Sequence, residues 1–437
     1  MYSAMKRTAL LLLFGALFTQ LHAQEAWPLE RCIQYALEHN LDLRAKQLEV
    51  AARQTELAQK RLAWLPSISA QLGHDWNWGR SVDMQELVIV RNALTQATGA
   101  SVGASIPVFS GGLLIHQHLA ARKAVEVAGF EAQDLRTALE TDVTRAYLEL
   151  MLAKQIHSYA RESHATILQQ RERTERLVEA GGQPKSALNE MEAQVAAEKA
   201  TLVAAECRVR TATLSLTQLM NLPGDTAFAT GEHFGPDSVV VQVPVLTNHQ
   251  TEAWLLRDPR IRSAKARIAQ LRYDEHAARS RFFPTLTASA AYGTFYSSTN
   301  EEPFRTQLDE NRNPSVGLRL TIPIFDGWQA ATQLKKSRLS LETARLTAEK
   351  IQTQVLEEIR SAGIEAENCL QQYLSSEETL QAMQNLLEIT EAKYNLGAAT
   401  ALDYIVARNK RLKAVSDFLQ AKWQYIFQLQ LLERYRP

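Results

Sequence analysis

The sequence SVGASIPVFSGG at residues 101–112 returns as SVGLRLTIPIFDGW at residues 315–328. Three further segments repeat in the same order: residues 41–46 match 259–265, residues 62–67 match 281–285, and residues 177–189 match 394–403. The period of roughly 216 residues is too long for one unit of a solenoid. The 437-residue chain is therefore expected to contain two duplicated halves, residues 24–220 and 251–437. Residues 221–250, which are rich in Pro and Gly, are expected to join them as a linker with a short strand.

Each half contains two stretches in which apolar and polar side chains alternate. They cover about residues 67–80, 98–109, 284–297 and 314–325. A period of two predicts a β-strand with one apolar and one polar face. These strands are long for a globular protein, and their length suits a strand that crosses a membrane at a tilt. The polar positions are rich in Ser, Thr and Gly, as expected for a wet lumen, although a soluble sandwich with one buried face would also alternate.

Aromatic side chains gather at both ends of the predicted strands. Amphipathic rings favour the two interfaces of a membrane, so this placement predicts a pair of aromatic girdles. The expected membrane-interface residues are Trp76, Trp78, Tyr292 and Tyr296 at one end, and Phe109, Phe325 and Trp328 at the other.

Two very long helices are predicted at residues 112–180 and 328–396, because no proline interrupts either stretch. A helix of that length extends about 100 Å. A second helix follows each, at residues 185–220 and 400–434, with apolar residues spaced alternately three and four apart. Such seams predict two antiparallel coiled-coil hairpins. One seam consists of Leu188, Met191, Val195, Glu198, Leu202, Ala205, Val209, Ala212, Leu216 and Leu219; the other, less regular, of Leu402, Ile405, Asn409, Leu412, Ser416, Leu419, Trp423 and Ile426.

Residues 1–23 have the features of a secretory signal peptide, with a basic start, an apolar run and a small residue before the expected cleavage point. An N-terminal membrane anchor is the alternative, but the apolar run is short for a span. Lys plus Arg and Asp plus Glu are each 48, so the charge balance gives no reason to expect a nucleic-acid partner. Cys32, Cys207 and Cys369 are odd in number and widely spaced, which predicts packing residues rather than disulfides.

Four strands are too few to close a barrel, because small closed barrels need about eight. An open sheet edge is not tolerated in hydrocarbon, since its backbone donors and acceptors would have no partners. Under the membrane interpretation, several copies of the chain must therefore share one barrel. A dimer would provide eight strands and a trimer twelve, and a transport function favours the trimer.

From residue 24 onward the chain resembles the TolC family of outer-membrane efflux proteins. The resemblance rests on residues 29–40, 63–66, 106–109, 323–327 and 394–403. It implies a mixed α and β membrane protein in which a homotrimer shares a twelve-stranded transmembrane β-barrel. A long periplasmic α-helical barrel of coiled-coil hairpins would continue that barrel from the outer membrane.

The resemblance also implies a function. The chain would be the passive outer-membrane channel of a tripartite efflux or type I secretion system, docked to a periplasmic adaptor protein. An inner-membrane pump of the RND, ABC or MFS type would drive transport, and the transported solute is not readable from the sequence. The main alternative is a periplasmic coiled-coil scaffold without a pore.

Two residues match positions that the family uses at the periplasmic entrance. Tyr394 matches a tyrosine that holds the entrance shut, and Asp403 matches the first of two acidic residues that ring the constriction. Ala399 and Val406 depart from the family pattern, which puts an ionic lock in doubt. We expect a single ring of Asp403 carboxylates, whose mutual repulsion would raise at least one pKa and attract cations. The alternative is that Asp403 only caps or solvates a helix.

The two hairpin tips are the predicted contacts with the adaptor. Glycine permits close approach of backbones, and each tip contains it. The tip residues concerned are Gly181, Gly182, Gly397, Ala398 and Thr400. The alternative is that each tip is a simple connection between two helices.

No enzymatic site is predicted. Residues 99–103 fit the G-x-S-x-G pattern, but they lie inside an alternating strand rather than at a sharp turn. An exported hydrolase that uses Ser101 is therefore a weaker alternative. His116 and His118 are two residues apart on a helix and would point to different sides, which suits a metal poorly. The chain has no phosphate-binding loop, so any energy is expected to come from a partner. No cofactor, metal or catalytic residue is expected.

Overall fold

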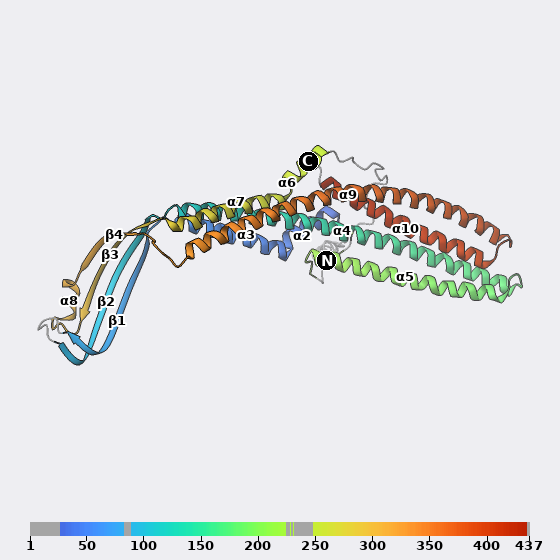
Figure 1. Ribbon diagram of the computed structural model, residues 1–437. Coiled ribbons are helices and arrows are strands. Elements are labelled where there is room, and N and C mark those ends of the chain that lie inside the picture. The colour runs from blue at the N-terminus through green and yellow to red at the C-terminus, as the bar shows by residue number, and fades with distance from the viewer. Residues whose placement is uncertain (1–26, 83–88, 224–227, 229, 231–247, 435–437) are drawn as a thin grey trace, which may run out of the picture. The chain divides into compact units, whose positions relative to one another are not determined.

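The computed structural model describes residues 27–82, 89–223, 228, 230 and 248–434. The predicted signal peptide and most of the predicted linker lie outside these residues. The chain divides into two units, which are described separately. Among the described residues, the sheet unit comprises those from 46 to 132 and from 256 to 353. The hairpin unit comprises those up to 45, those from 133 to 255 and those from 354 onward. Figure 1 labels the elements in chain order.

The sheet unit contains one antiparallel sheet of four strands in the order β1-β2-β3-β4. The strands are β1 (Ser67–Val82), β2 (Ile89–Phe109), β3 (Thr285–Ser297) and β4 (Asn313–Thr321). Strand β2 begins well before the expected residue 98. Strand β4 ends before the expected residue 325, because Pro323 has no N–H to donate to a ladder. A short helix, α8 (Phe304–Glu310), lies in the connection between β3 and β4.

Each half of the chain has the same order of elements, a helix, two strands, a very long helix and a shorter helix. The first half has α3 (Leu41–Leu62), α4 (Leu113–Glu179) and α5 (Lys185–Leu219). The second has α7 (Pro259–Arg279), α9 (Gln329–Asn395) and α10 (Ala401–Arg434). Helix α2 (Leu29–His39) precedes α3, and α6 (Asn248–Arg257) precedes α7. The predicted mixed fold with duplicated halves is confirmed.

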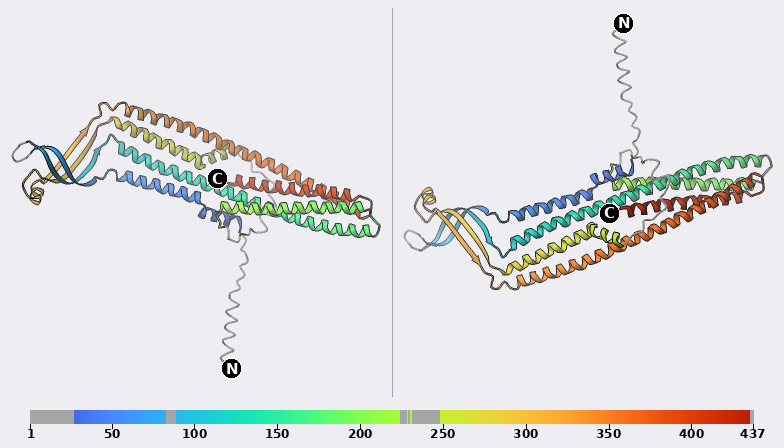
Figure 2. Two further views of the ribbon diagram at one scale, coloured as in Figure 1. Left: turned by 90° about the horizontal axis from the view of Figure 1, so that it is seen from below. Right: turned by 90° about the horizontal axis from the view of Figure 1, so that it is seen from above.

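Helices α4 and α9 are each 67 residues long. In the hairpin unit α4 runs beside α5 and α9 runs beside α10, as both views of Figure 2 show. None of the described helices combines the length and the apolar content that a membrane span requires.

Glycine is required where β2 gives way to α4. Gly111 has φ +61°, and a Cβ built there would lie 2.6 Å from Cβ of Phe283 and 2.8 Å from the carbonyl oxygen of Ser280. Only a residue without a side chain combines that φ with so close an approach. The glycine therefore fixes how the start of α4 packs against the end of the helix that precedes β3.

The predicted seam of α5 faces inward throughout. Met191, Ala205 and Leu216 are buried, the other apolar seam residues are half-buried, and the polar seam residue Glu198 is buried as well. The core of the hairpin unit combines α2, α4, α5 and α10 around large side chains such as Tyr147 and Trp423.

The predicted seam of α10 is wrong at Leu402 and Asn409 in its first two turns, although Ile405 between them is buried as predicted. Leu402 is 58% exposed and Asn409 is exposed, whereas the neighbouring Tyr404 and Arg408 are buried. Residues of α10 share one apolar cluster with α4, α5 and α9. A helix with several neighbours buries a face wider than the narrow stripe of a two-stranded coiled coil, which explains the difference.

The three cysteines are free thiols, as expected. Cys32 and Cys369 are buried packing residues, and burial raises the pKa of the Cys32 thiol to about 12. Cys207 is exposed on α5, so its assignment as a packing residue is wrong.

Candidate functional site

The register of the sheet brings the four apolar strand faces onto one side. Ala70 lies opposite Val102, Val102 lies opposite Tyr292, and Ala290 lies opposite Val316. In the single chain this face is uncovered, and Val316 is 89% exposed. The large apolar side chains exposed on it include Ile68, Leu72, Trp76, Trp78, Leu94, Val102, Tyr292, Val316, Leu318 and Leu320.

The opposite face of the sheet carries small and polar side chains, with the exposed Phe295 as a large apolar exception. Ser69, Gly103, Ala291 and Ser315 follow one another across the four strands. A hollow of about 790 Å³ lies against the sheet. Its lining includes Gln71, Gly99, Ser101, Gly293, Asn313 and Ser315. The sheet therefore separates an apolar surface from a hydrated one, as a wall between lipid and water would.

The predicted membrane-interface aromatics do not all lie on strands. Trp76, Trp78 and Tyr296 lie toward the end of the sheet at which β1 ends and β2 begins. Tyr292 lies further from that end, opposite Val102. At the other end a register shift next to Pro107 places Phe109 opposite Leu286, on the apolar face. Phe325 and Trp328 lie in the connection from β4 to α9 and are exposed.

The two hairpin tips repeat one backbone motif. At the end of α4 the amide of Gly182 donates to the carbonyl of Leu177 over 2.8 Å. At the end of α9 the amide of Ala398 donates to the carbonyl of Lys393, also over 2.8 Å. In both motifs a glycine with φ +74° turns the chain, Gly181 in one and Gly397 in the other. These tip residues and Thr400 are exposed. Leu396, which belongs to the same predicted tip and lies beside Gly397, is 85% exposed.

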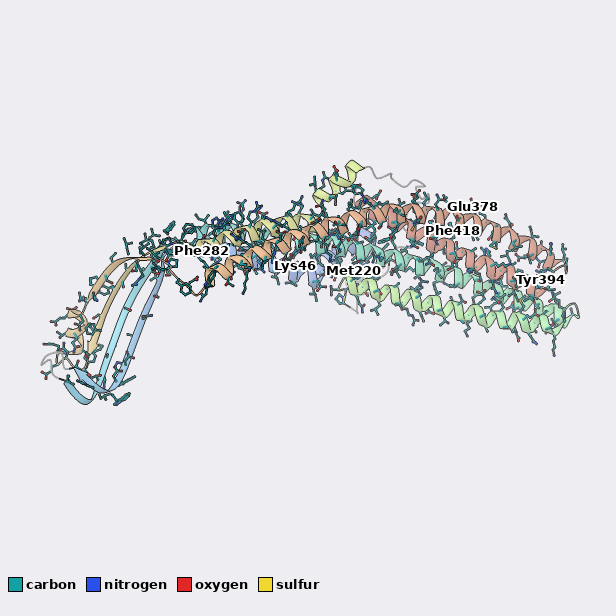
Figure 3. The ribbon with its side chains drawn as sticks, in the orientation of Figure 1. Lys46, Met220, Phe282, Glu378, Tyr394 and Phe418 are labelled. Atoms are coloured by element: carbon teal, nitrogen blue, oxygen red, sulfur yellow. The ribbon has the colours of Figure 1, made fainter. Side chains whose placement is uncertain are left out.

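Tyr394 is buried near the tip of the hairpin unit (Figure 3) and joins the two hairpins. Its hydroxyl lies 3.2 Å from the Thr174 hydroxyl on α4 and accepts a 3.5 Å hydrogen bond from the Gln183 amide. Its ring stacks on that of Tyr404 with centroids 5.4 Å apart. Beside it, Arg173 of α4 donates to Asn395 of α9 over 2.8 Å. Tyr394 thus contacts both hairpins where they end.

Asp403 caps the first turn of α10. The hydroxyl and amide of Thr400 donate to the Asp403 carboxylate over 2.7 and 3.0 Å, and the Asp403 amide donates back to the Thr400 hydroxyl over 3.1 Å. This is a reciprocal capping box. The bonds from Thr400 hold the pKa of the Asp403 carboxyl below its ordinary value. Asp403 therefore caps a helix in the single chain, and its carboxylate is exposed, so the ring of carboxylates stays a prediction.

A buried charge behind the tip was not predicted. Arg408 on α10 lies against Ser163 of α4 and Glu198 of α5. The one signal in the sequence was Glu198, the polar residue in an otherwise apolar seam. The sequence gave no sign that Arg408 is buried, because a cation on a helix is usually solvated.

The residues weighed for chemistry lie apart from one another. Ser101 lies within β2, opposite Gln71 and Gly293, and is not at a sharp turn. The His116 ring stacks on that of His276 with centroids 5.1 Å apart, while the His118 ring meets Trp64 edge-on. Among the described residues no group of three or more His, Cys, Asp or Glu is arranged to hold a metal.

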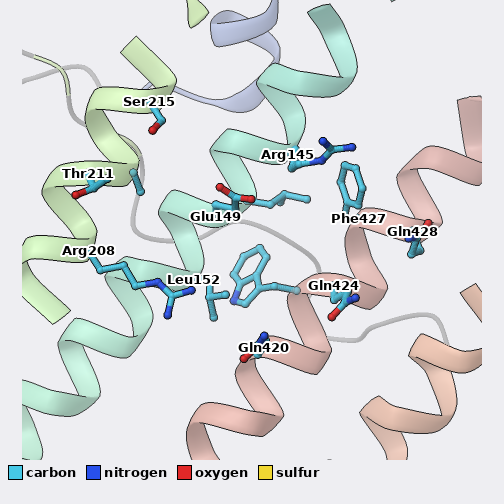
Figure 4. Close-up of a pocket in the computed structure, with 13 residues that line it drawn as sticks. Arg145, Glu149, Leu152, Arg208, Thr211, Ser215, Gln420, Gln424, Phe427 and Gln428 are labelled. Atoms are coloured by element: carbon cyan, nitrogen blue, oxygen red, sulfur yellow. The ribbon is translucent and has the colours of Figure 1, made fainter. Parts of the chain in front are cut away.

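A hollow of about 550 Å³ lies in the hairpin unit between α4, α5 and α10 (Figure 4). The guanidinium of Arg145 lies 5.1 Å from the centre of the Phe427 ring, and Arg208 and Glu149 also line the hollow. Charged, polar and aromatic side chains from these three helices line the hollow.

Comparison with known proteins agrees with this geometry. The outer membrane efflux protein family model matches residues 32–222 and 252–435. The outer membrane protein TolC of Vibrio cholerae is 20% identical over 97% of this chain and 93% of its own length. The outer membrane efflux protein BepC of Brucella suis is 23% identical over 63% of this chain, which spans 58% of that relative. The structure of the Campylobacter jejuni CmeC outer membrane channel superposes with a TM-score of 0.82 and 16% identity, over 93% of this chain and 85% of that one.

The fold and its two-faced sheet define an outer-membrane protein whose helices extend into the periplasm. Because the family model covers most of the chain, this protein belongs to the outer membrane efflux protein family.

Proposed function

We propose that three copies of this chain form one outer-membrane channel, through which solutes leave the periplasm passively. The observation that carries the proposal is the four-stranded sheet. Its apolar face is uncovered, and within the described part of the chain its edge strands β1 and β4 each pair on one side only. Lipid can cover the apolar face, but only further strands can satisfy the edges. Twelve strands leave room for a channel, whereas eight are nearly filled by side chains.

The partners follow from the same proposal. A duct has no energy source of its own, so an inner-membrane pump of the RND, ABC or MFS type must drive transport. A periplasmic adaptor would connect the pump to the channel. Relatives with the names outer membrane efflux protein BepC and alkaline protease secretion protein AprF support either efflux or type I secretion. The exposed tip residues Gly181, Gly182, Gly397, Ala398 and Thr400 are the proposed adaptor contacts.

The entrance is proposed to lie at the hairpin tips. Tyr394 would hold the two hairpins of a protomer together through Thr174, and three Asp403 carboxylates would face one another on the axis. In the assembled trimer their mutual repulsion would oppose the pKa-lowering effect of Thr400. The protein would act without catalysis, cofactor or bound metal.

Fractionation tests the proposed function. Outer-membrane extracts are separated by electrophoresis in mild detergent with and without heating, and the band of the mature chain is located. We expect an oligomer that heating converts to a monomer. A water-soluble monomer in the periplasmic fraction would support a coiled-coil scaffold instead.

A further inference from the structure

A pair of opposite charges is buried behind the hairpin tip, where the sequence suggests only apolar packing. Arg408 of α10 is 4% exposed and Glu198 of α5 is 3% exposed. Charged side chains are seldom buried to this degree unless they have partners. The contacts of this pair therefore decide what it does.

The pair connects three helices of the hairpin unit. The Arg408 guanidinium donates to the carbonyl of Ser163 on α4 and, over 2.7 Å, to the hydroxyl of the same residue. Its Nε atom lies 3.9 Å from the Glu198 carboxylate on α5. The Gln194 side chain donates to Glu198 over 3.3 Å and to Asn409 of α10 over 2.9 Å. Helix α10 is thus tied to both helices of the other hairpin.

The same pair reaches the proposed entrance through aromatic rings. Arg408 lies beside the phenol of Tyr404, whose pKa is raised by burial against the opposing effect of Arg408. The Tyr404 ring stacks on Tyr394, whose hydroxyl meets Thr174 at the tip. A continuous set of contacts therefore links the buried charge to the residue proposed to hold the entrance shut.

The buried pair is incompletely satisfied. The Nη1 atom of Arg408 is buried and has no hydrogen-bond partner among the described residues. The 3.9 Å contact with Glu198 is an ion pair but too long for a hydrogen bond. A buried ion pair of this quality repays little more than the loss of hydration of its two charges, so it holds the helices together weakly and can be released. It regains that hydration when the helices separate and water enters.

We propose that Arg408 and Glu198 form an interior latch. The latch holds α10 against α4 and α5 while the entrance is shut, and its two charges part and become hydrated when the entrance opens. Arg408 is a positioning residue that acts on Tyr394 through Tyr404. The inference rests on the proposed channel function.

Single-channel recording of the purified full-length protein in planar bilayers tests the latch. The variants Arg408→Met and Glu198→Gln each leave one partner buried without its counterpart, and water would enter to hydrate it. We expect either variant to raise the open probability roughly tenfold. The double variant Arg408→Met with Glu198→Met leaves an apolar layer that water does not enter, so it is expected to open no more often than the wild type.

Three controls separate a latch from a loss of stability. Lys410→Met and Glu206→Gln remove exposed charges from the same two helices and should leave the open probability unchanged. Leu216 lies on α5, away from the tip, and is buried in the core of the hairpin unit. Leu216→Ala leaves a cavity there, so it should lower the melting temperature without opening the channel. Arg408→Lys keeps the charge but not the planar fork, and is expected to be intermediate. It is measured in place of Arg408→Met if that variant fails to assemble.

The outcomes are distinct. Open probability that rises in the single variants and returns to the wild-type value or below in the double variant supports the latch. An open probability that stays at the wild-type value, or rises no more than in Leu216→Ala, overturns it. If the wild type itself conducts no ions, the proposed channel function fails and the latch fails with it. If Tyr394→Phe opens the channel but the latch variants do not, only the latch is wrong.

Discussion

At the scale of single residues, Tyr394 joins two hairpins through one hydroxyl group. We predict that Tyr394→Phe removes the bonds with Thr174 and Gln183 but keeps the stack on Tyr404. The loss of unfolding free energy should be only about 1 kcal/mol, the net value of a typical hydrogen bond. The conductance in planar bilayers should nevertheless rise, because the tips are less firmly joined. Tyr159→Phe alters an exposed tyrosine of the same helix as Thr174 and should change neither quantity.

Asp403 has two proposed roles that substitution can separate. Asp403→Asn removes the charge and retains an oxygen that can accept from Thr400, whereas Thr400→Ala removes the cap and retains the charge. If three carboxylates ring the entrance, Asp403→Asn should abolish cation selectivity and Thr400→Ala should preserve it. Reversal potentials in a salt gradient measure the selectivity. Unchanged selectivity in Asp403→Asn would leave the residue as a helix cap only.

The pKa of Asp403 predicts how the α10 cap depends on pH. Folding lowers this pKa, so the ionised carboxylate stabilises the cap above the pKa of the unfolded chain. The stabilisation is lost as the pH falls through the lower pKa of the folded chain. Hydrogen exchange across the first turns of α10, corrected for intrinsic rates, should therefore show protection at neutral pH that weakens in acid. In Asp403→Asn the protection should not change over the same range.

The residue-scale features differ in how far the sequence predicts them. Tyr394 and Asp403 lie in a motif, so their position at the tip could be predicted. Asp403 also finds its partner Thr400 within that motif, whereas Thr174, the partner of Tyr394, lies far away in the chain. Arg408 could not be predicted, because the three-and-four spacing places Asn409 rather than Arg408 in the seam. Which side of α10 is buried depends on its packing against several helices, and one helix alone does not contain that information.

At the scale of elements, the alternation of the strands determines which side chains meet lipid. We predict that Val316→Arg prevents assembly in the outer membrane, because an arginine at the lipid face costs roughly 2–4 kcal/mol near the bilayer centre. Ser315→Arg places the same side chain on the opposite face and should assemble. Heat-modifiable oligomer in outer-membrane extracts is the measurement. Equal assembly of both variants would mean that the apolar face is not lipid-exposed.

The strand-to-helix junction makes a second prediction at this scale. Gly111→Ala should destabilise the protein more than Gly397→Ala, although both glycines have positive φ. At Gly397 the new methyl group meets nothing within 4 Å, so the cost is the backbone conformation alone, about 1 kcal/mol. At Gly111 the methyl group overlaps Phe283 and the Ser280 carbonyl. Thermal unfolding of the two variants should show the larger loss for Gly111→Ala.

The elements themselves were largely predictable from periodicity. The period of two marks the four strands, and long stretches without proline mark α4 and α9. The ends were less predictable. Strand β2 begins at Ile89 because it pairs with the far end of β1, and pairing partners do not appear in a local pattern. Phe325 and Trp328 looked like strand-end aromatics, but Pro323 ends the ladder before them.

At the scale of the whole molecule, the duplication explains why one chain provides two pairs of strands and two hairpins. Sequence reasoning could establish that the sheet needs further strands, because backbone groups in hydrocarbon must be paired. It could not establish the number of copies, because that number depends on barrel curvature and on contacts between chains. In the described residues, the exposed apolar face and the two open edges of β1 and β4 likewise indicate that further strands are needed.

Ion conduction by the purified full-length protein after insertion into a planar bilayer tests the central claim most directly. The account predicts discrete current steps of one size, from a species that migrates as an oligomer until it is heated. Both the wild type and Tyr394→Phe, whose entrance should be open, are measured. If both are shown to be inserted in the bilayer and neither passes current, the account is contradicted.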